Sequence, residues 1–133
     1  MADKLPPTIL IAEDEPHIVE SLTFLFEQKG YSVLTASDGA DTLRVLRSRR
    51  PDLVILDVMM HHHTGFDVLR ILRSEPAIAA TKVLMLTAKG QNAERRLAQD
   101  LGADAFVAKP FSNRELVATA EALLQTKTRP ATS

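Results

Sequence analysis

The feature that most constrains the fold is an alternation between two kinds of segment, which occurs five times along the chain. A short apolar run rich in β-branched residues comes first, and a longer segment follows whose apolar residues recur at helical spacing. The expected strands are 8–12, 32–36, 53–56, 82–86 and 105–108. Such an alternation is typical of an open, parallel α/β sheet with helices on both faces. Periodicity alone leaves the order of the strands open.

Local signals predict where the helices begin and end. Pro16 suits the first turn of the first helix, and Asp38 and Ser112 are expected to cap the second and the last. Gly30 and Gly102 supply stops. The fourth helix is marked by apolar residues at a spacing of four, namely Ala93, Leu97 and Leu101. The last helix has four residues that are expected to face the core, namely Leu116, Ala120, Leu123 and Leu124.

Length and composition exclude several classes of protein. A chain of 133 residues has the size of one domain, expected over residues 1–126 with a flexible tail over 127–133. A formal net charge of -1 argues against direct binding of nucleic acid. There is no cysteine, so disulfides and thiolate metal sites are excluded. The N-terminus lacks the apolar core of a signal peptide, and no apolar run approaches the roughly 18 residues of a membrane helix, so a cytoplasmic protein without membrane contact is expected.

Polar residues stand where four of the five expected strands end. They are Glu13 and Asp14 after the first strand, Asp57 after the third, Thr87 after the fourth and Lys109 after the fifth. Sites in open α/β sheets lie beyond the carboxyl ends of the strands, so these side chains are expected at one edge. Each one alone has an ordinary structural explanation, as a helix cap, a turn residue or a solvated lysine. Those explanations do not account for all of them at the same edge.

Three carboxylates brought together repel one another and need positive charge nearby. Lys109 supplies one charge, and an all-oxygen set of ligands suits Mg²⁺. A carboxylate, Mg²⁺, a hydroxyl and a lysine are the groups that phosphoryl transfer requires, and a carboxylate can itself be the nucleophile. The pattern is therefore compatible with phosphoryl transfer at this edge, in which a carboxylate nucleophile would give an acyl phosphate.

The chain resembles the receiver domains of two-component response regulators over about residues 7–126. The motifs that carry the resemblance are ILIAEDEP, LVILDVMM followed by TGFDVL, VLMLTA, and GADAFVAKPF. The resemblance implies a flavodoxin-like fold with five parallel strands in the order 2-1-3-4-5. In that order the first and third strands are neighbours, which would bring Glu13 and Asp14 to Asp57.

The resemblance also implies a role for each matching residue. Asp57 corresponds to the phosphate acceptor, and Thr87 and Lys109 would contact the phosphoryl oxygens. The Mg²⁺ ligands would be Asp14, Asp57, the backbone carbonyl of Met59, and Glu13 through water. Phe106 stands where the family has an aromatic switch residue, often tyrosine, so a switch here would work by packing alone. The peptide before Pro110 is expected to be cis.

The function that follows is a signalling module rather than an enzyme acting on metabolites. A sensor histidine kinase or a phosphotransfer protein would phosphorylate Asp57, and phosphorylation would change a surface formed by the fourth helix, fifth strand and fifth helix. The sequence does not name the downstream effector, and it leaves open a dimer that forms on phosphorylation. Two alternatives stay open: a flavodoxin-like cofactor binder, disfavoured by the acidic AEDEP loop, and a metal-responsive or phosphorylation-independent receiver.

Three consecutive histidines, His61–His63, follow Asp57 and depart from the family pattern, which commonly has a proline at His61. Successive residues of an extended loop point to opposite sides, so at most His61 and His63 face one metal ion, with His17 as the candidate third ligand. A closed zinc site usually takes four ligands, so a solvated loop with micromolar or weaker Zn²⁺ binding is expected. In mild acid these imidazoles would become cationic and weaken Mg²⁺ binding.

Overall fold

The computed structural model describes residues 6–60, 64–88 and 90–125. Strands and helices alternate strictly within these residues. The strands are β1 (Thr8–Ala12), β2 (Ser32–Ala36), β3 (Leu53–Asp57), β4 (Lys82–Ala88) and β5 (Ala105–Lys109). The helices are α1 (Pro16–Gln28), α2 (Gly39–Arg49), α3 (Gly65–Ser74), α4 (Asn92–Asp100) and α5 (Asn113–Gln125).

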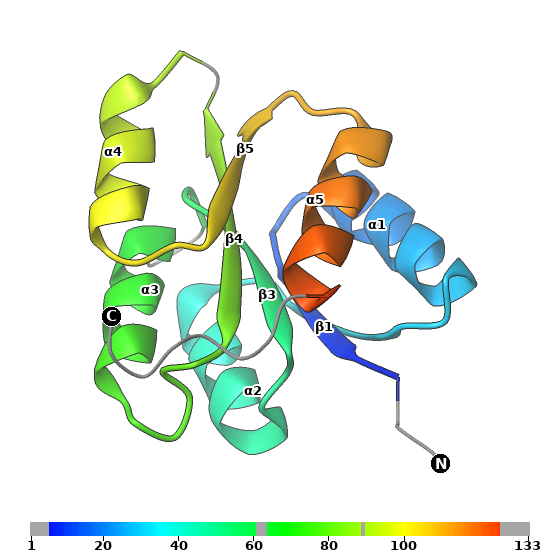
Figure 1. Ribbon diagram of the computed structural model, residues 1–133, viewed down its shortest axis with the longest axis horizontal. Coiled ribbons are helices and arrows are strands. Elements are labelled where there is room, and N and C mark those ends of the chain that lie inside the picture. Colours follow the sequence, from blue (N-terminus) through cyan, green and yellow to red (C-terminus); the bar gives the residue numbers. More distant parts are fainter. Residues whose placement is uncertain (1–5, 61–63, 89, 126–133) are drawn as a thin grey trace.

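The five strands form one parallel sheet in the order β2-β1-β3-β4-β5. Helices α1 and α5 cover one face of the sheet, and α2, α3 and α4 cover the other (Figure 1). The α/β class and the flavodoxin-like strand order are therefore confirmed. Because strand order reverses between β1 and β3, the carboxyl ends of these two neighbours open the crevice in which such sheets place their sites.

The two faces of the sheet bury separate hydrophobic clusters because alternate residues of each strand point to opposite sides. Leu10, Val54 and Met85 pack under α2, α3 and α4. Ile9, Ile55 and Leu84 pack under α1 and α5. All five residues of β3 are buried, as its unbroken apolar run predicted.

The helix ends agree with most of the local signals. The side chain of Asp38 accepts a hydrogen bond from the Asp41 amide, and Ser112 Oγ accepts one from the Glu115 amide at 3.0 Å. Pro16 is the first residue of α1, and Gly102 adopts a φ of 98° after α4. In α5, Leu116 and Ala120 are fully buried, whereas Leu123 and Leu124 are only partly buried.

Helix α4 departs from what its apolar spacing suggests. Leu97 is 38% exposed, Ala93 is also exposed, and Ala98 is the buried residue of the helix. A spacing of four marks one side of a helix but does not say which side packs on the sheet. Consequently α4 presents apolar surface outward.

The last turn of α3 is tied to the corner that follows α4 by a single arginine. Arg73 donates to the carbonyls of Ala79, Thr81 and Gly102 and to Asp104 Oδ2, the last at 2.9 Å. Asp104 Oδ2 also accepts the Val83 amide at 2.8 Å.

Within the described residues, no helix is both long and apolar enough to cross a membrane.

Candidate functional site

Carboxylates from two neighbouring strands meet at the carboxyl edge of the sheet. Glu13 and Asp14 follow β1 directly, and Asp57 is the last residue of β3. Register pairs Ala12 with Leu56, so the residues that follow lie level with one another. One oxygen from each of these three carboxylates lies within 4.8 Å of the others. Glu13 and Asp57 are buried, at 1% and 4% exposure, and Asp14 is partly exposed.

Lys109 brings a positive charge to the same point from the end of β5. Its Nζ lies 2.9 Å from Asp57 Oδ2, to which it donates a hydrogen bond, and 3.0 Å from Glu13 Oε1. The contact with Glu13 is an ion pair without hydrogen-bond geometry, which leaves the buried Oε1 without a hydrogen-bond partner. The Lys109 ammonium therefore contacts the carboxylates of Asp57 and Glu13, and the carboxylate of Asp14 lies close to both.

The protonation equilibria reflect this crowding. Burial raises the pKa of Glu13 to about 7; the Lys109 ammonium opposes the shift, and the Asp57 charge adds to it. Burial disfavours the ammonium of Lys109, but its contacts with Asp57 and Glu13 outweigh burial and raise its pKa. The site thus holds more negative charge than Lys109 neutralises. Its hard oxygen donors, including an orphaned buried one, fit a divalent cation such as Mg²⁺.

Thr87 lies on β4, the strand next to β3. Its Oγ1 is buried and has no hydrogen-bond partner, which is an uncommon state for a hydroxyl. Thr87 is therefore a strand residue with an unused donor rather than the helix cap that a threonine in this place suggests. Asp57 Oδ1 accepts the Met59 amide at 3.2 Å, so both carboxylate oxygens of Asp57 are already engaged.

The segment after β3 is held close to the strand by Gly65. A Cβ at Gly65 would lie 2.3 Å from the carbonyl oxygen of Asp57, and the Gly65 amide donates to the Val58 carbonyl at 2.7 Å. Only glycine fits this approach. Met59 is 66% exposed. His61–His63 lie outside the described residues, so the histidine hypothesis is not placed by the structure.

Two cavities flank the acidic cluster. One, of about 370 Å³, is lined by Glu13, Asp14 and residues of α1 and of the start of α2. The other, of about 590 Å³, is mostly apolar and is lined by Asp57 but not by Glu13 or Asp14. Asp57, Thr87 and Lys109 line its floor, and its walls come from α1, from Met59 and from the segment after the cis Lys109–Pro110 peptide. His17 is exposed at its rim.

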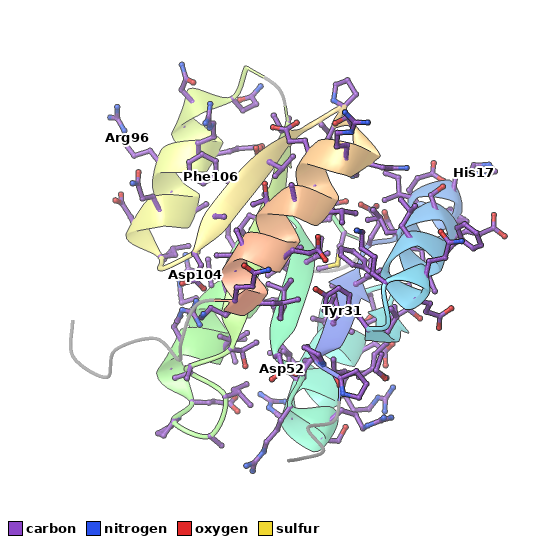
Figure 2. The ribbon with its side chains drawn as sticks, turned by 45° about the vertical axis from the view of Figure 1, so that its right-hand side comes forward. His17, Tyr31, Asp52, Arg96, Asp104 and Phe106 are labelled. Atoms are coloured by element: carbon purple, nitrogen blue, oxygen red, sulfur yellow. The ribbon has the colours of Figure 1, made fainter. Side chains whose placement is uncertain are left out.

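Phe106 lies on β5 at the outer side of the sheet, next to α4 (Figure 2). The ring is partly buried, and the guanidinium of Arg95 lies over it at 4.6 Å from the centroid. Register pairs Phe106 with Met85, two residues before Thr87 on the neighbouring strand. Sequence reasoning found Phe106 through the family resemblance but missed Arg95, because no local pattern links a helical arginine to a ring on a later strand.

The described geometry brings together every residue that the sequence assigned to the strand edge. The fold has the parallel order of a flavodoxin-like protein, and its site is an acidic cluster with one lysine. The response regulator receiver domain family matches residues 9–121. The chain belongs to this family, whose members are signalling modules of two-component systems.

Individual relatives agree with this assignment. The chain is 41% identical over 117 residues to the alkaline phosphatase synthesis transcriptional regulatory protein PhoP of Bacillus subtilis, a match covering 88% of this chain and 48% of PhoP. It is 37% identical over 123 residues to the DNA-binding response regulator MtrA of Mycolicibacterium smegmatis, covering 92% and 53%. The chain thus spans about half the length of these curated relatives. A response regulator of Chloroflexus aurantiacus superposes with a TM-score of 0.86 at 30% identity, covering 91% of this chain and 99% of that one.

Proposed function

We propose that Asp57 accepts a phosphoryl group from a sensor histidine kinase or a phosphotransfer protein, in a reaction that requires Mg²⁺. The observation that carries this proposal is the convergence of Glu13, Asp14 and Lys109 on Asp57 at one edge of the sheet. Membership of the receiver family supports it. The unit that performs this function is the domain over residues 1–126.

The residues divide the work of the transfer. An Asp57 carboxylate oxygen attacks phosphorus, the P–N bond to the donor histidine breaks, and the electron pair of that bond stays on the imidazole. Glu13, Asp14, Asp57 and the Met59 carbonyl would hold Mg²⁺, which supplies positive charge to the transferring oxygens. Lys109 already touches Asp57 and need only shift to a phosphoryl oxygen. Water later hydrolyses the acyl phosphate and restores the carboxylate.

We expect the protein that carries the donor histidine to reach Asp57 through the apolar cavity next to it. Asp57 lines this cavity together with residues of α1 and of the segment after Pro110, and most of the other lining residues are apolar. Ile18, Met59 and Phe111 offer side chains that a helix bearing the donor histidine would cover. The metal side of the cluster opens separately, between α1 and α2. Donor and metal would therefore reach Asp57 from different sides.

Phosphorylation would act on the surface formed by α4, β5 and α5 through Thr87 and Phe106. The unpartnered hydroxyl of Thr87 is free to donate to a phosphoryl oxygen, and its movement would leave room toward Phe106. Phe106 would then rotate inward and leave Arg95. The exposed apolar residues Ala93 and Leu97 of α4 would form part of the surface that binds an effector. A dimer formed through this surface is a second outcome. DNA binding, which MtrA's name states of that protein, is not assigned to this chain.

Incubation with acetyl phosphate, followed by intact mass measurement, tests the assignment. Wild-type protein with Mg²⁺ should gain one phosphoryl group, and the gain should disappear without Mg²⁺ or in Asp57→Asn. Efficient labelling of the Asn variant would place the acceptor elsewhere. Wild-type protein that takes no phosphoryl group but responds to Zn²⁺ through its histidines would favour the alternative, a metal-responsive receiver.

A further inference from the structure

The carboxylate of Glu94, in the first turn of α4, is bound to the backbone of β4. Its Oε1 accepts the Ala88 amide at 3.0 Å, and the Ala88 carbonyl accepts the Gln91 amide at 3.2 Å. Ala88 directly follows Thr87 and ends β4. A side chain of α4 therefore closes the connection between strand and helix next to the reactive edge.

The Ala88 amide points toward the space beyond Asp57. Alternate residues of a strand direct their N–H and C=O groups to the same side. The carbonyl of Leu86 faces β3, because it accepts the Val58 amide at 3.0 Å. Ala88, two residues later, must also face β3, which by then has ended at Asp57, the partner of Leu86 in register. Ala88 lines the same cavity as Asp57, Thr87 and Lys109.

Glu94 does not perform the ordinary task of an acidic residue at its position. It is the third residue of α4, where a glutamate usually reaches back to the amide of the N-cap residue. Gln91 is the N-cap and its side chain makes no capping hydrogen bond, yet Glu94 passes it and binds Ala88 instead. The contact thus leaves the helix end poorly capped while it occupies a donor that faces the site.

We propose that Glu94 is a built-in competitor of the phosphoryl group: its carboxylate occupies the Ala88 amide until phosphorylated Asp57 displaces it. This inference rests on the proposed function of Asp57. A phosphoryl group carries negative oxygens that accept the same kind of hydrogen bond, and its charge repels a carboxylate nearby. The two anions cannot share one N–H group.

Displacement of Glu94 would be transmitted directly to the output surface. Once its carboxylate leaves Ala88, the first turn of α4 loses that tie to β4. The next residue, Arg95, covers the ring of Phe106, so movement of this turn also uncovers Phe106. The contact therefore sets a threshold for phosphorylation and couples it to α4.

The test compares Glu94→Ala and Glu94→Gln with wild type. Glu115→Ala is the control, since Glu115 is the third residue of α5, exposed and equally charged, and the described contacts of its side chain do not involve the site. The probe is beryllofluoride with saturating Mg²⁺, a noncovalent analogue of the phosphoryl group, titrated while the amide resonance of Ala88 is followed by NMR. We expect Glu94→Ala to bind it roughly two- to fivefold more tightly, the scale of one partly exposed charge interaction. Glu94→Gln should fall between the two, because it keeps an acceptor and loses the charge.

Each result decides the inference. An Ala88 resonance that moves in Glu94→Ala before any probe is added, together with tighter binding, supports it. Equal affinities in Glu94→Ala and Glu115→Ala, or an Ala88 resonance unaffected by loss of Glu94, overturns it while leaving phosphorylation of Asp57 intact. If wild type binds no beryllofluoride and takes no phosphoryl group from acetyl phosphate, the proposed function fails first and the inference fails with it.

Discussion

At the scale of single residues, the site is organised by an imbalance of charge. Asp57, Glu13 and Asp14 crowd one point, and Lys109 touches two of them. Thr87 contributes a buried hydroxyl that has no hydrogen-bond partner. Under the proposed function, the Thr87 hydroxyl would gain a hydrogen-bond partner in the phosphoryl group, and Lys109 would exchange Asp57 for a phosphoryl oxygen.

Lys109→Ala and Thr87→Ala should accordingly fail chiefly in signalling. Both variants are expected to accept a phosphoryl group on Asp57, but the shift of the α4 and β5 amide resonances on phosphorylation should be largely lost. Each loses a hydrogen bond to a charged group, worth about 1.5–3 kcal/mol, so the active population should fall by roughly tenfold or more.

Lys109→Arg and Thr87→Ser are the matched controls, because they keep the charge and the hydroxyl. Amide spectra of phosphorylated protein supply the measurement. A full shift of α4 and β5 in the alanine variants would show that the switch does not run through these two side chains.

At the scale of elements, a tyrosine ties the α1–β2 turn to α5. Tyr31 Oη donates to Glu121 Oε2 at 2.9 Å, and its ring packs edge-on against Phe26, with centroids 6.0 Å apart (Figure 2 labels Tyr31). Lys29 lies 3.8 Å from the same carboxylate. Helices α1 and α5 cover one face together, and Glu121 is where the turn after α1 meets α5.

The Tyr31 phenol should ionise above its usual pH. Burial raises its pKa above the ordinary value of 10.0, and the hydrogen bond to Glu121 and that residue's charge raise it further. A pKa raised on folding contributes stability that is present below the ordinary value and is lost as pH rises through the folded value. Tyr31 is the one tyrosine and there is no tryptophan, so phenolate absorbance after a rapid pH jump reports it alone.

Glu121→Gln removes the negative charge and keeps an acceptor, so the titration midpoint should move back toward the ordinary value. Glu115→Gln, elsewhere on α5, should leave it unchanged. Identical midpoints in wild type and Glu121→Gln would contradict an electrostatic contribution from Glu121.

At the scale of the whole molecule, the sheet joins two hydrophobic layers through adjacent residues. Ile55 and Leu56 are neighbours on β3, both fully buried, and they belong to opposite layers. Because the central strand contributes to both, neither layer can lose its packing without disturbing the strand that supports the other. The domain should therefore unfold as one cooperative unit.

Ile55→Ala and Leu56→Ala should each lower the free energy of unfolding by about 2–5 kcal/mol, with an unchanged denaturant slope. Leu97→Ala, on the exposed side of α4, should cost no more than about 0.5 kcal/mol. Urea unfolding followed by circular dichroism gives the three values. Two separate transitions in either core variant would show that the layers unfold independently.

The sequence by itself determined the local structure and the chemistry of the strand ends. Strands 8–12 and 32–36 have the bounds that their short, β-branched segments predicted, because such residues favour the extended backbone of a strand. The other three strands continue one or two residues beyond their apolar runs, to Asp57, Ala88 and Lys109. Pairing with the neighbouring strand, not hydrophobicity, sets these ends.

Only the tertiary structure decided what depends on pairing between distant segments. Periodicity did not place β1 beside β3, which brings Glu13 to Asp57. It also did not place β4 between β3 and β5, which brings Lys109 to Asp57, 52 residues away. It did not say that Leu97 faces outward, that Arg95 covers Phe106, or that Glu94 takes the Ala88 amide. Such contacts arise from how helices are set against the sheet, and local residue patterns carry no information about that geometry because they describe one element at a time.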